Sequence, residues 1–397
     1  MIEAVARQRV RVAGRRADSR LLAFLKRLDW VLMAAAFALV GYGLWVVSGI
    51  TRFDVPGDQQ YYVVRQAIAG VLGVAALAAA AIVPIDLARR HWRLLYCATL
   101  ALMILVFLVA ETIRGSKRWI DLGVIQFQPS ELGKVLFVLA IAGFLVGRQG
   151  RVNRWRTIVQ AIGLGTVPIL LVFLQPDLGT ALVYGAALVA VLFFVGVRWR
   201  QLLVFLVAVA FVGLSIIWLL PTAGVEVLKP YQSERVAGFL DPDRDPSGLT
   251  WNVNQSMTAV GAGGLTGRGI VEASQTRLDY LPEHATDFAF ASLAEQRGFV
   301  GSAILLLLYL LVVWRGLRVI TVAGDLYGAV VAGGLVFALL FQVFVNVGMT
   351  MGVAPVTGIP LPFVTVGGSS LVTNLVLVGV LQGIHARGLL ANRPSPP

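Results

Sequence analysis

The sequence is poor in charge and nearly lacks cysteine. Charged side chains make up 14% of the 397 residues, and Cys97 is the only cysteine. A single cysteine excludes an intrachain disulfide framework and a thiolate metal site. There is also no internal repeat, no low-complexity segment and no recognisable soluble domain. With 58% hydrophobic residues and a mean hydropathy of +0.81, the composition excludes an ordinary soluble enzyme.

Hydrophobic runs fill most of the chain. A helix needs about 20 apolar residues to cross roughly 30 Å of hydrocarbon. We predict ten membrane-spanning helices, at 29–50, 62–84, 94–110, 131–147, 157–174, 179–197, 202–220, 289–313, 321–350 and 368–384. We expect the ninth to be kinked, because Gly333 and Gly334 split it and Asn346 interrupts it. The sequence therefore predicts an all-α, polytopic membrane protein.

The net charge of +12 is mostly a topology signal. With the N-terminus inside, 21 Lys and Arg residues fall in cytoplasmic segments and 10 in outer ones. Such an excess is typical of the cytoplasmic loops of membrane proteins. An even number of spans then places both termini in the cytoplasm. The basic N-terminal arm can lie on anionic lipid, and no nucleic-acid partner is expected.

The predicted domain organisation is simple. Residues 1–28 form a basic cytoplasmic arm, residues 29–386 a ten-helix membrane domain, and residues 387–397 a short cytoplasmic tail. The first span is too long for a signal peptide and is expected to remain as an anchor. Three longer segments lie on the outer side, at 111–130, 221–288 and 352–367. Because long loops on a rigid scaffold often carry function, we expect any chemistry outside the cytoplasm.

Charged residues cluster where the eighth span begins, between Leu281 and Gly298. The cluster comprises Glu283, His284, Asp287 and Glu295. Burying charges in hydrocarbon is costly unless they are paired or hydrated, so intramembrane charges mark candidate sites. Asp287 has two interpretations, a helix N-cap or a functional carboxylate. Glu295 is predicted to lie about 12 Å deeper along the same helix.

Polar residues next to other spans are further candidates. Glu131 and Lys134 are three residues apart, so they share a helix face and can pair. Lys134 is then either the buried half of that pair or a ligand for a diphosphate. Asp177 either caps the sixth span or helps to hold a divalent cation. Arg235, in the long outer loop, has the fork geometry that binds two phosphate oxygens.

Two glycine-rich stretches also stand next to predicted spans. Residues 261–269 match neither the Walker nor the dinucleotide-binding spacing, and we expect a flexible loop that shapes a cavity. Residues 367–370 open the tenth span with two glycines and two serines. Small residues there allow close packing, and the hydroxyl groups can cap the helix.

Together these motifs resemble the SEDS family, which includes RodA and FtsW, over about residues 27–386. The stretches that carry the resemblance are Arg118-Trp119-Ile120-Asp121-Leu122-Gly123, Gln128-Pro129-Ser130-Glu131 with Lys134, Gln175-Pro176-Asp177-Leu178-Gly179-Thr180, Arg235 with Phe239-Leu240-Asp241-Pro242, Asn254-Gln255-Ser256, Leu281-Pro282-Glu283-His284 with Thr286-Asp287-Phe288, and Gly367-Gly368-Ser369-Ser370. Two positions depart from the usual pattern. Ala285 separates His284 from Thr286, and Val366 stands where an aromatic residue is common.

Members of this family are peptidoglycan glycosyltransferases with the architecture of polyprenyl-sugar (GT-C-like) glycosyltransferases. The resemblance implies that the chain polymerises lipid II into β-1,4 glycan strands at the outer face of the bacterial cytoplasmic membrane. It implies a class B penicillin-binding protein as the transpeptidase partner, besides membrane lipids. Asp287 matches the family's catalytic aspartate and would take the proton from the acceptor GlcNAc 4-hydroxyl, with partial desolvation raising its pKa.

The resemblance also suggests roles for other residues. Those expected to bind substrate are Lys134, Arg235, Lys117, Arg118, His284, Gln255 and Ser369. Those expected to support them are Glu131, Glu295, Asp177, Glu283 and Trp119. Glu131 and Glu295 would orient or neutralise the cations that hold the diphosphate. No metal ligand is assigned, and a requirement for Mg²⁺ or Mn²⁺ stays open.

Other functions stay open as well. A flippase for lipid-linked oligosaccharide would also carry charges within the membrane, but it would place polar groups along a path to both faces. Here the acidic residues cluster on the outer side. A scaffold for cell-wall assembly would leave Asp287 without a task. Between the two branches of the family, the absence of long cytoplasmic tails favours a RodA-like role in elongation over an FtsW-like role in division.

Overall fold

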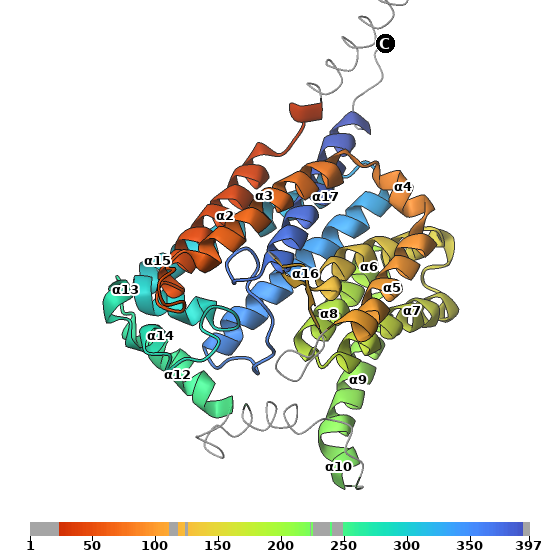
Figure 1. Ribbon diagram of the computed structural model, residues 1–397. Coiled ribbons are helices and arrows are strands. Elements are labelled where there is room, and N and C mark those ends of the chain that lie inside the picture. The colour runs from red at the N-terminus through yellow and green to blue at the C-terminus, as the bar shows by residue number, and fades with distance from the viewer. Residues whose placement is uncertain are drawn as a thin grey trace, which may run out of the picture.

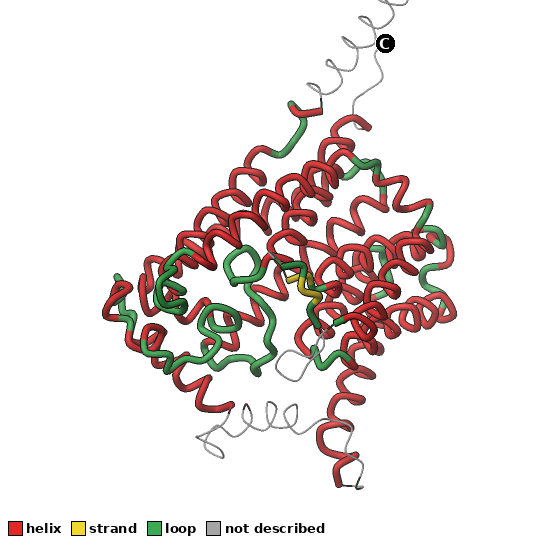
Figure 2. Tube along the Cα trace, in the orientation of Figure 1, coloured by secondary structure: helices red, strands yellow, loops and turns green. Residues whose placement is uncertain are grey.

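The computed structural model describes residues 24–110, 118–123, 126–222, 224, 239 and 249–391, which are almost entirely helical (Figures 1 and 2). Most of the predicted N-terminal arm and the last residues of the tail therefore lie outside the described residues. In the described part, nine helices are long and apolar enough to cross a membrane. A tenth apolar helix, α8 (Leu178–Phe194), has 17 residues. The all-α membrane fold predicted from hydropathy is confirmed.

The nine long helices overlap nine of the ten predicted spans, in order. They are α2 (Trp30–Ile50), α3 (Tyr61–Ile82), α5 (Trp92–Val109), α6 (Pro129–Val146), α7 (Trp155–Leu174), the continuous run of α9 (Trp199–Leu214), η2 (Ser215–Leu219) and α10 (Leu220–Thr222), α15 (Ala289–Val322), α16 (Leu326–Thr350) and α17 (Gly368–Ala391). Aspartates cap three helices, because Asp29, Asp177 and Asp325 each accept a backbone N–H of the first turn. Proline at the first position starts α6.

Shorter elements lie between the spans. The helical ones are α4 (Ile85–Arg90), η1 (Gln149–Arg151), α12 (Leu249–Ala262), α13 (Gly269–Glu272) and α14 (Ser274–Arg277). Strands β1 (Ile120–Asp121) and β2 (Gln126–Phe127) pair antiparallel, with Ile120 opposite Phe127. The hairpin and the longer loops gather at the end of the bundle that carries α12 and α14 (Figure 2). Helix α4 lies at the opposite end (Figure 1).

The kink expected in the ninth span lies instead in the eighth. Helix α16 is continuous through Gly333 and Gly334, where the missing side chains make room for neighbouring helices. A Cβ at Gly333 would lie 2.2 Å from the Phe194 ring of α8. In α15, by contrast, Gly298 leaves helical geometry with φ 64° and ψ −162°, a conformation essentially confined to glycine. The prediction for α16 was wrong because a glycine can serve close packing as well as bending.

Residues 261–269 pack against this break in α15. The amides of Phe299 and Val300, which the break deprives of helical partners, donate to the carbonyls of Gly264 and Leu265 at 2.8 and 3.1 Å. In a membrane protein every backbone polar group needs such a partner, since hydrocarbon supplies none. The glycine-rich stretch is therefore a hydrogen-bonding partner of α15, and the expected flexible, cavity-shaping loop is not what the structure shows.

Close helix contacts build the centre of the bundle. Helices α6, α16 and α17 are the most buried of the long helices. In the most apolar 18-residue window of each, 89%, 72% and 83% of the residues are buried. Helix α17 lies along α3, where a Cβ at Gly379 would meet the Leu77 carbonyl at 2.3 Å. Small residues let the two backbones approach. The helical run Trp199–Thr222, whose most apolar window is 0% buried, stands at the edge and projects from the bundle (Figure 1).

Three helix ends lie several residues from their predicted positions. Helix α15 continues to Val322, so α16 begins at Leu326, five residues later than predicted. Helix α17 continues to Ala391, beyond the predicted boundary at 386. Hydropathy marks the apolar part of a helix, whereas these helices extend as polar turns past it.

Candidate active site

The charged run ends in a tight turn ahead of α15. Residues 281–288 form consecutive turns, and the N-cap residue of α15 is Phe288, whose side chain makes no capping hydrogen bond. The half-buried Asp287 is therefore not the N-cap of the helix. Asn346 Nδ2 of α16 donates to the Asp287 carbonyl at 3.0 Å and to the Ile359 carbonyl at 2.8 Å. Asn346 thus fixes the backbone position of Asp287 against α16.

Glu283 shapes the turn that carries Asp287. Its φ of 58° is left-handed, which is uncommon for a residue with a side chain. Its carbonyl accepts the amides of Thr286 and Phe288 at 3.1 and 3.2 Å. The Thr286 hydroxyl donates to Glu283 Oε2 at 2.8 Å. Glu283 therefore holds the turn through its backbone and through its carboxylate.

His284 lies between two carboxylates. Its Nε2 is 3.1 Å from Asp54 Oδ1, in the loop after α2, and its Nδ1 is 3.4 Å from Asp279 Oδ1. Burial lowers the pKa of the imidazole, but the hydrogen bond and the charge of Asp54, together with Asp279, outweigh it and raise the pKa of His284. The imidazole therefore ties the turn of residues 281–288 to the loop after α2.

The segment before α17 joins this turn to α3. The Val366 amide donates to the Ala285 carbonyl at 3.0 Å, and the Thr365 hydroxyl donates to the Thr286 carbonyl at 3.1 Å. Gln66 Nε2 of α3 donates to the Thr365 carbonyl at 3.1 Å. The turn and α3, both distant in sequence, thereby hold one short segment in place.

Beyond this segment, hydrogen bonds join three further motifs. Ser369 Oγ of α17 accepts the Gln128 amide at 3.1 Å, and Gln128 Nε2 donates to Asp177 Oδ2 at 3.0 Å. The other carboxylate oxygen of Asp177 accepts the Thr180 amide at 3.0 Å, which confirms Asp177 as the helix cap. The same oxygen lies 3.9 Å from Arg118 Nη1. Asp177 therefore both caps α8 and faces a guanidinium group.

Arg118 is the partly exposed cation of this group. Its side chain is 19% exposed, and its guanidinium carbon lies 5.7 Å from the Trp119 ring centre. Its Nε is buried and has no hydrogen-bond partner among the described residues. Such an unpartnered donor is costly to bury, so this guanidinium retains the capacity to bind an anion.

The pairing predicted for Glu131 and Lys134 is confirmed. Lys134 Nζ lies 2.8 Å from Glu131 Oε1, and both side chains are buried in α6. Tyr184 of α8 donates its hydroxyl to the Ser130 carbonyl at 2.9 Å just beside them. The second oxygen of Glu131 has no hydrogen-bond partner among the described residues. The pair is thus held within the helix bundle next to the start of α6.

Two predicted residues fall outside the described residues, and one has other partners than expected. Lys117 and Arg235 lie outside the described residues. The fully buried Glu295 accepts the amides of Gln275 and Thr276 at 2.8 and 2.9 Å and the Thr276 hydroxyl at 2.7 Å. Its partners are therefore at α14, not the cations that it was expected to orient. Glu295 anchors α14 to α15.

Gln255 lies half-buried on α12, away from the hydrogen bonds described above. Its neighbour Ser256 donates to the Thr350 carbonyl at 2.8 Å, which packs α12 against the end of α16. Among the residues that the structure describes, no group of three or more His, Cys, Asp or Glu side chains is placed to hold a metal ion.

Four residues of this region were not assigned to it from the sequence. They are Asp54, Gln66, Asn346 and Thr365. Asn346 left a signal, since an amide inside an apolar span is unusual. The other three carry no local signal, because only the folded chain places them beside the turn of residues 281–288.

The chain matches known proteins over nearly its whole length. The sequence profile of the FtsW, RodA and SpoVE family, described as cell cycle proteins, matches residues 27–388. The peptidoglycan glycosyltransferase MrdB of Escherichia coli is 36% identical over 90% of this chain and 94% of its own length. Stage V sporulation protein E of Bacillus subtilis is 35% identical over 90% of this chain and 96% of its own.

Solved structures agree with these relatives. One, described as showing how a peptidoglycan synthase complex coordinates polymerization and crosslinking, has a TM-score of 0.77 and 34% identity and covers 91% of this chain and 98% of its own. The rod shape determining protein RodA of Thermus thermophilus has a TM-score of 0.65 and 30% identity, over 90% of this chain and 96% of its own. The chain therefore belongs to the FtsW, RodA and SpoVE family of membrane proteins.

Proposed function

We propose that this chain polymerises lipid II into β-1,4-linked glycan strands at the outer face of the bacterial cytoplasmic membrane. The chain is a peptidoglycan glycosyltransferase, the activity for which its relatives are named. One observation supports the lipid-linked substrate above the others. A half-buried carboxylate, Asp287, lies in the turn whose Thr286 carbonyl is hydrogen-bonded to Thr365. The segment of residues 365–369 in turn bonds Gln128, Gln128 bonds Asp177, and Asp177 lies 3.9 Å from the cation Arg118.

Asp287 is the proposed general base. The 4-hydroxyl oxygen of the acceptor GlcNAc attacks the anomeric carbon of the donor, and Asp287 takes the hydroxyl proton. The bond to the undecaprenyl diphosphate breaks, and the leaving diphosphate keeps the electron pair. Attack opposite the leaving group inverts the α-linkage of the donor to a β-linkage. A well-placed base typically contributes roughly 10²–10⁴-fold in rate.

Arg118 and Lys134 are proposed to stabilise the departing diphosphate. A guanidinium group offers paired donors to phosphate oxygens. The buried Nε of Arg118 has no hydrogen-bond partner among the described residues. Asp177 and Glu131 hold these two cations in place before substrate binds. Lys117 and Arg235 are proposed as further diphosphate ligands on the same motifs.

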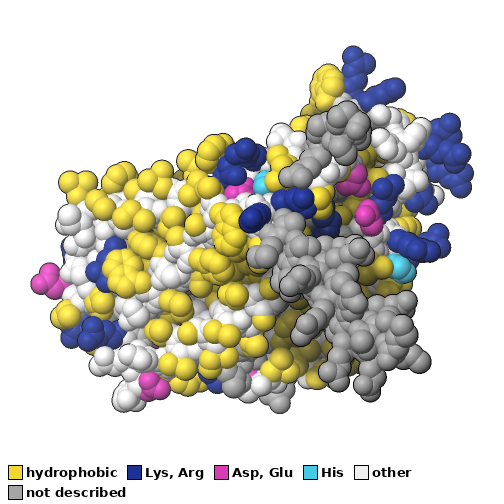
Figure 3. Space-filling model, turned by 90° about the horizontal axis from the view of Figure 1, so that it is seen from above, with side chains coloured by type: hydrophobic (Ala, Val, Ile, Leu, Met, Phe, Trp, Pro, Cys, Tyr) yellow, Lys and Arg dark blue, Asp and Glu magenta, His cyan; other side chains and the backbone are white. Residues whose placement is uncertain are grey.

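The proposed orientation puts both termini in the cytoplasm. Support comes from the charge distribution, since Lys and Arg side chains gather along one side of the end that bears α4 and α17 (Figure 3). Helices α12 and α14, which precede the turn of residues 281–288 in the chain, lie toward the other end (Figure 1). Chemistry at the outer face follows from this orientation.

A class B penicillin-binding protein is the proposed partner. The structural match to a synthase complex that couples polymerization with crosslinking supports this proposal. A role in elongation, rather than division, stays a prediction, because relatives from both branches match the chain at similar identity. A divalent cation, Mg²⁺ or Mn²⁺, would accompany the diphosphate of the substrate. Its concentration is therefore varied in the assay.

Polymerisation of labelled lipid II by the purified chain tests the function and the base together. We expect Asp287→Ala and Asp287→Asn to lower the rate by at least about 100-fold, because no base then accepts the hydroxyl proton. Asp58→Asn, on the exposed first outer loop, is the matched control and should polymerise normally. The measurement is glycan chain length, with and without the transpeptidase and with and without divalent cation.

Detergent solution separates this function from the flippase alternative. A polymerase makes glycan with no bilayer present, whereas a flippase makes no glycan in detergent. Folded Asp287→Ala protein with normal activity would refute the role of Asp287. Wild-type protein that makes no polymer with any cation or partner would refute the function itself.

A further inference from the structure

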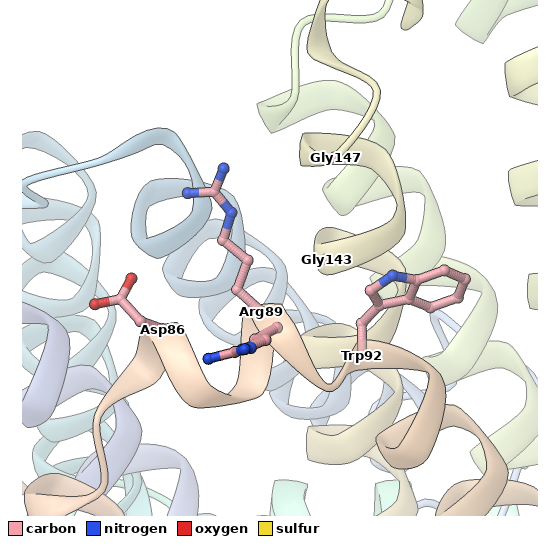
Figure 4. A pocket seen from close by; sticks show the side chains of 6 residues that line it. Asp86, Arg89, Trp92, Gly143 and Gly147 are labelled. Atoms are coloured by element: carbon pink, nitrogen blue, oxygen red, sulfur yellow. The ribbon is translucent and has the colours of Figure 1, made fainter.

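A cavity of about 310 Å³ opens at the end of the bundle opposite the candidate active site. Its walls come from α4, the start of α5 and the end of α6, and are formed by Asp86, Arg89, Arg90, Trp92, Gly143 and Gly147 (Figure 4). The volume has room for roughly ten water molecules at about 30 Å³ each, or for a small polar headgroup. None of the functional motifs discussed above contributes to it.

Positive charge dominates this cavity. Arg89 lies 3.6 Å from Asp325, with both side chains nearly half exposed, whereas Arg90 makes no ion pair or hydrogen bond with the described part of the chain. Two more guanidinium groups lie on aromatic rings near the cavity. Arg93 lies over Trp92, a lining residue, at 5.5 Å, and Arg148 lies over Phe144 at 3.9 Å. The lining itself therefore holds two arginines and one carboxylate, that of Asp86.

The walls suit the boundary between lipid headgroups and acyl chains. Trp92 and Phe144 meet edge to face, with ring centres 5.4 Å apart. A Cβ at Gly143 would lie 2.6 Å from Trp92 Cβ, so glycine is needed for α5 to approach α6 this closely. Beside the cavity, Leu87 and Leu94 are 52% and 66% exposed, as expected for side chains that contact acyl chains.

We propose that this cavity binds the headgroup of an anionic phospholipid of the inner leaflet. The phosphodiester would lie between the guanidinium groups of Arg89 and Arg90, whose forks can each bind two oxygens. The acyl chains would lie along Leu87 and Leu94. Basic pockets between spans on the cytoplasmic side commonly bind such headgroups. The exposed leucines favour a lipid over a free phosphate ion.

Thermal stability in neutral detergent tests the proposal without any activity assay. Phosphatidylglycerol, phosphatidylcholine and inorganic phosphate are titrated separately into wild-type protein and into the double variant Arg89→Gln with Arg90→Gln. We expect phosphatidylglycerol alone to raise the melting temperature of wild type, and the double variant to need about tenfold more of it. Arg89→Lys with Arg90→Lys keeps the charge, loses the fork and should respond in between.

Arg198→Gln with Arg200→Gln is the matched control. This pair also removes two arginines at an interfacial tryptophan, since Arg200 lies over Trp199 at 5.9 Å, and neither residue lines the cavity. It should respond to phosphatidylglycerol as wild type does. Equal responses of the two glutamine double variants would overturn the proposal. So would stabilisation by inorganic phosphate that equals the lipid and depends on Arg89 and Arg90, which would indicate a free-phosphate site.

Discussion

At the scale of single residues, His284 shows how a charged side chain can be kept at a membrane surface. Burial alone would lower the pKa of the imidazole, yet Asp54 and Asp279 approach its two ring nitrogens from different segments and raise it. The ring links residues 281–288 to the loop after α2. Because Asp287 lies three residues further on, this contact helps to position the proposed base.

The contact makes stability depend on pH. The pKa of His284 is raised in the folded protein, so its stabilising contribution is complete below the unfolded value of about 6.5 and is lost as pH rises through the folded value. We expect Asp54→Asn to lower stability by about 1–3 kcal/mol at pH 6 and by less at pH 9. Melting temperatures across this pH range measure the effect. Asp58→Asn in the same loop should keep the wild-type profile, and a parallel profile for Asp54→Asn would contradict the assignment.

At the scale of elements, α15 combines two segments through one break. The first segment, up to Arg297, is bonded to α14 by Glu295 and to α2 by Gln296 Nε2, which donates to the Gly49 carbonyl at 3.2 Å. The second segment continues as a regular helix to Val322. Gly298 joins them with a backbone conformation that other residues rarely adopt.

Gly298→Ala should therefore be strongly destabilising. The new Cβ would lie 2.3 Å from the Gly267 amide nitrogen and 2.6 Å from the Leu265 carbonyl oxygen, and neither backbone atom can move aside cheaply. We expect a loss of about 3 kcal/mol or more. Gly185→Ala in α8, with no atom within 4 Å of its new Cβ, should melt as wild type or slightly higher. Similar melting temperatures for both variants would show that the break tolerates a side chain.

At the scale of the whole molecule, a buried ion pair joins the first span to two of the last three. Asp29 accepts two hydrogen bonds from Arg315 Nε, at 3.1 and 2.9 Å, and one from Nη2 at 2.6 Å. Its backbone N–H and C=O both bond the Gln382 side chain at 2.8 Å. Helices α2, α15 and α17 thus meet at one polar contact at the end of the bundle near α4.

Asp29→Asn tests how much this contact contributes. Asparagine can still cap α2, so the substitution removes mainly the charge opposite buried Arg315. We expect a loss of about 3–5 kcal/mol, because one buried charge is left unpaired. Asp325→Asn is the matched control, since Asp325 also caps a helix and pairs with an arginine, but near the surface. It should cost no more than about 1 kcal/mol. Equal losses in denaturation measurements would contradict the role of burial.

The sequence predicted those features that depend on local pattern. Hydropathy located ten apolar helices, because the hydropathy of a helix is averaged over about 20 residues. The pairing of Glu131 with Lys134 and the capping by Asp177 were predictable because helix geometry fixes contacts three residues apart. The contact of His284 with Asp54 was not, because 230 residues separate the two. The break at Gly298 was missed since neighbouring glycines that serve only packing look the same in sequence.

The break in α15 also has a mechanical consequence. A rigid helix acts as a lever, so any tilt imposed on its lipid-facing half by bilayer thickness would swing its other end. Here the residues that follow Asp287 are fastened to residues 261–269 and to α2, and the swing is taken up at Gly298. The proposed base is thereby insulated from deformation of the membrane that surrounds it.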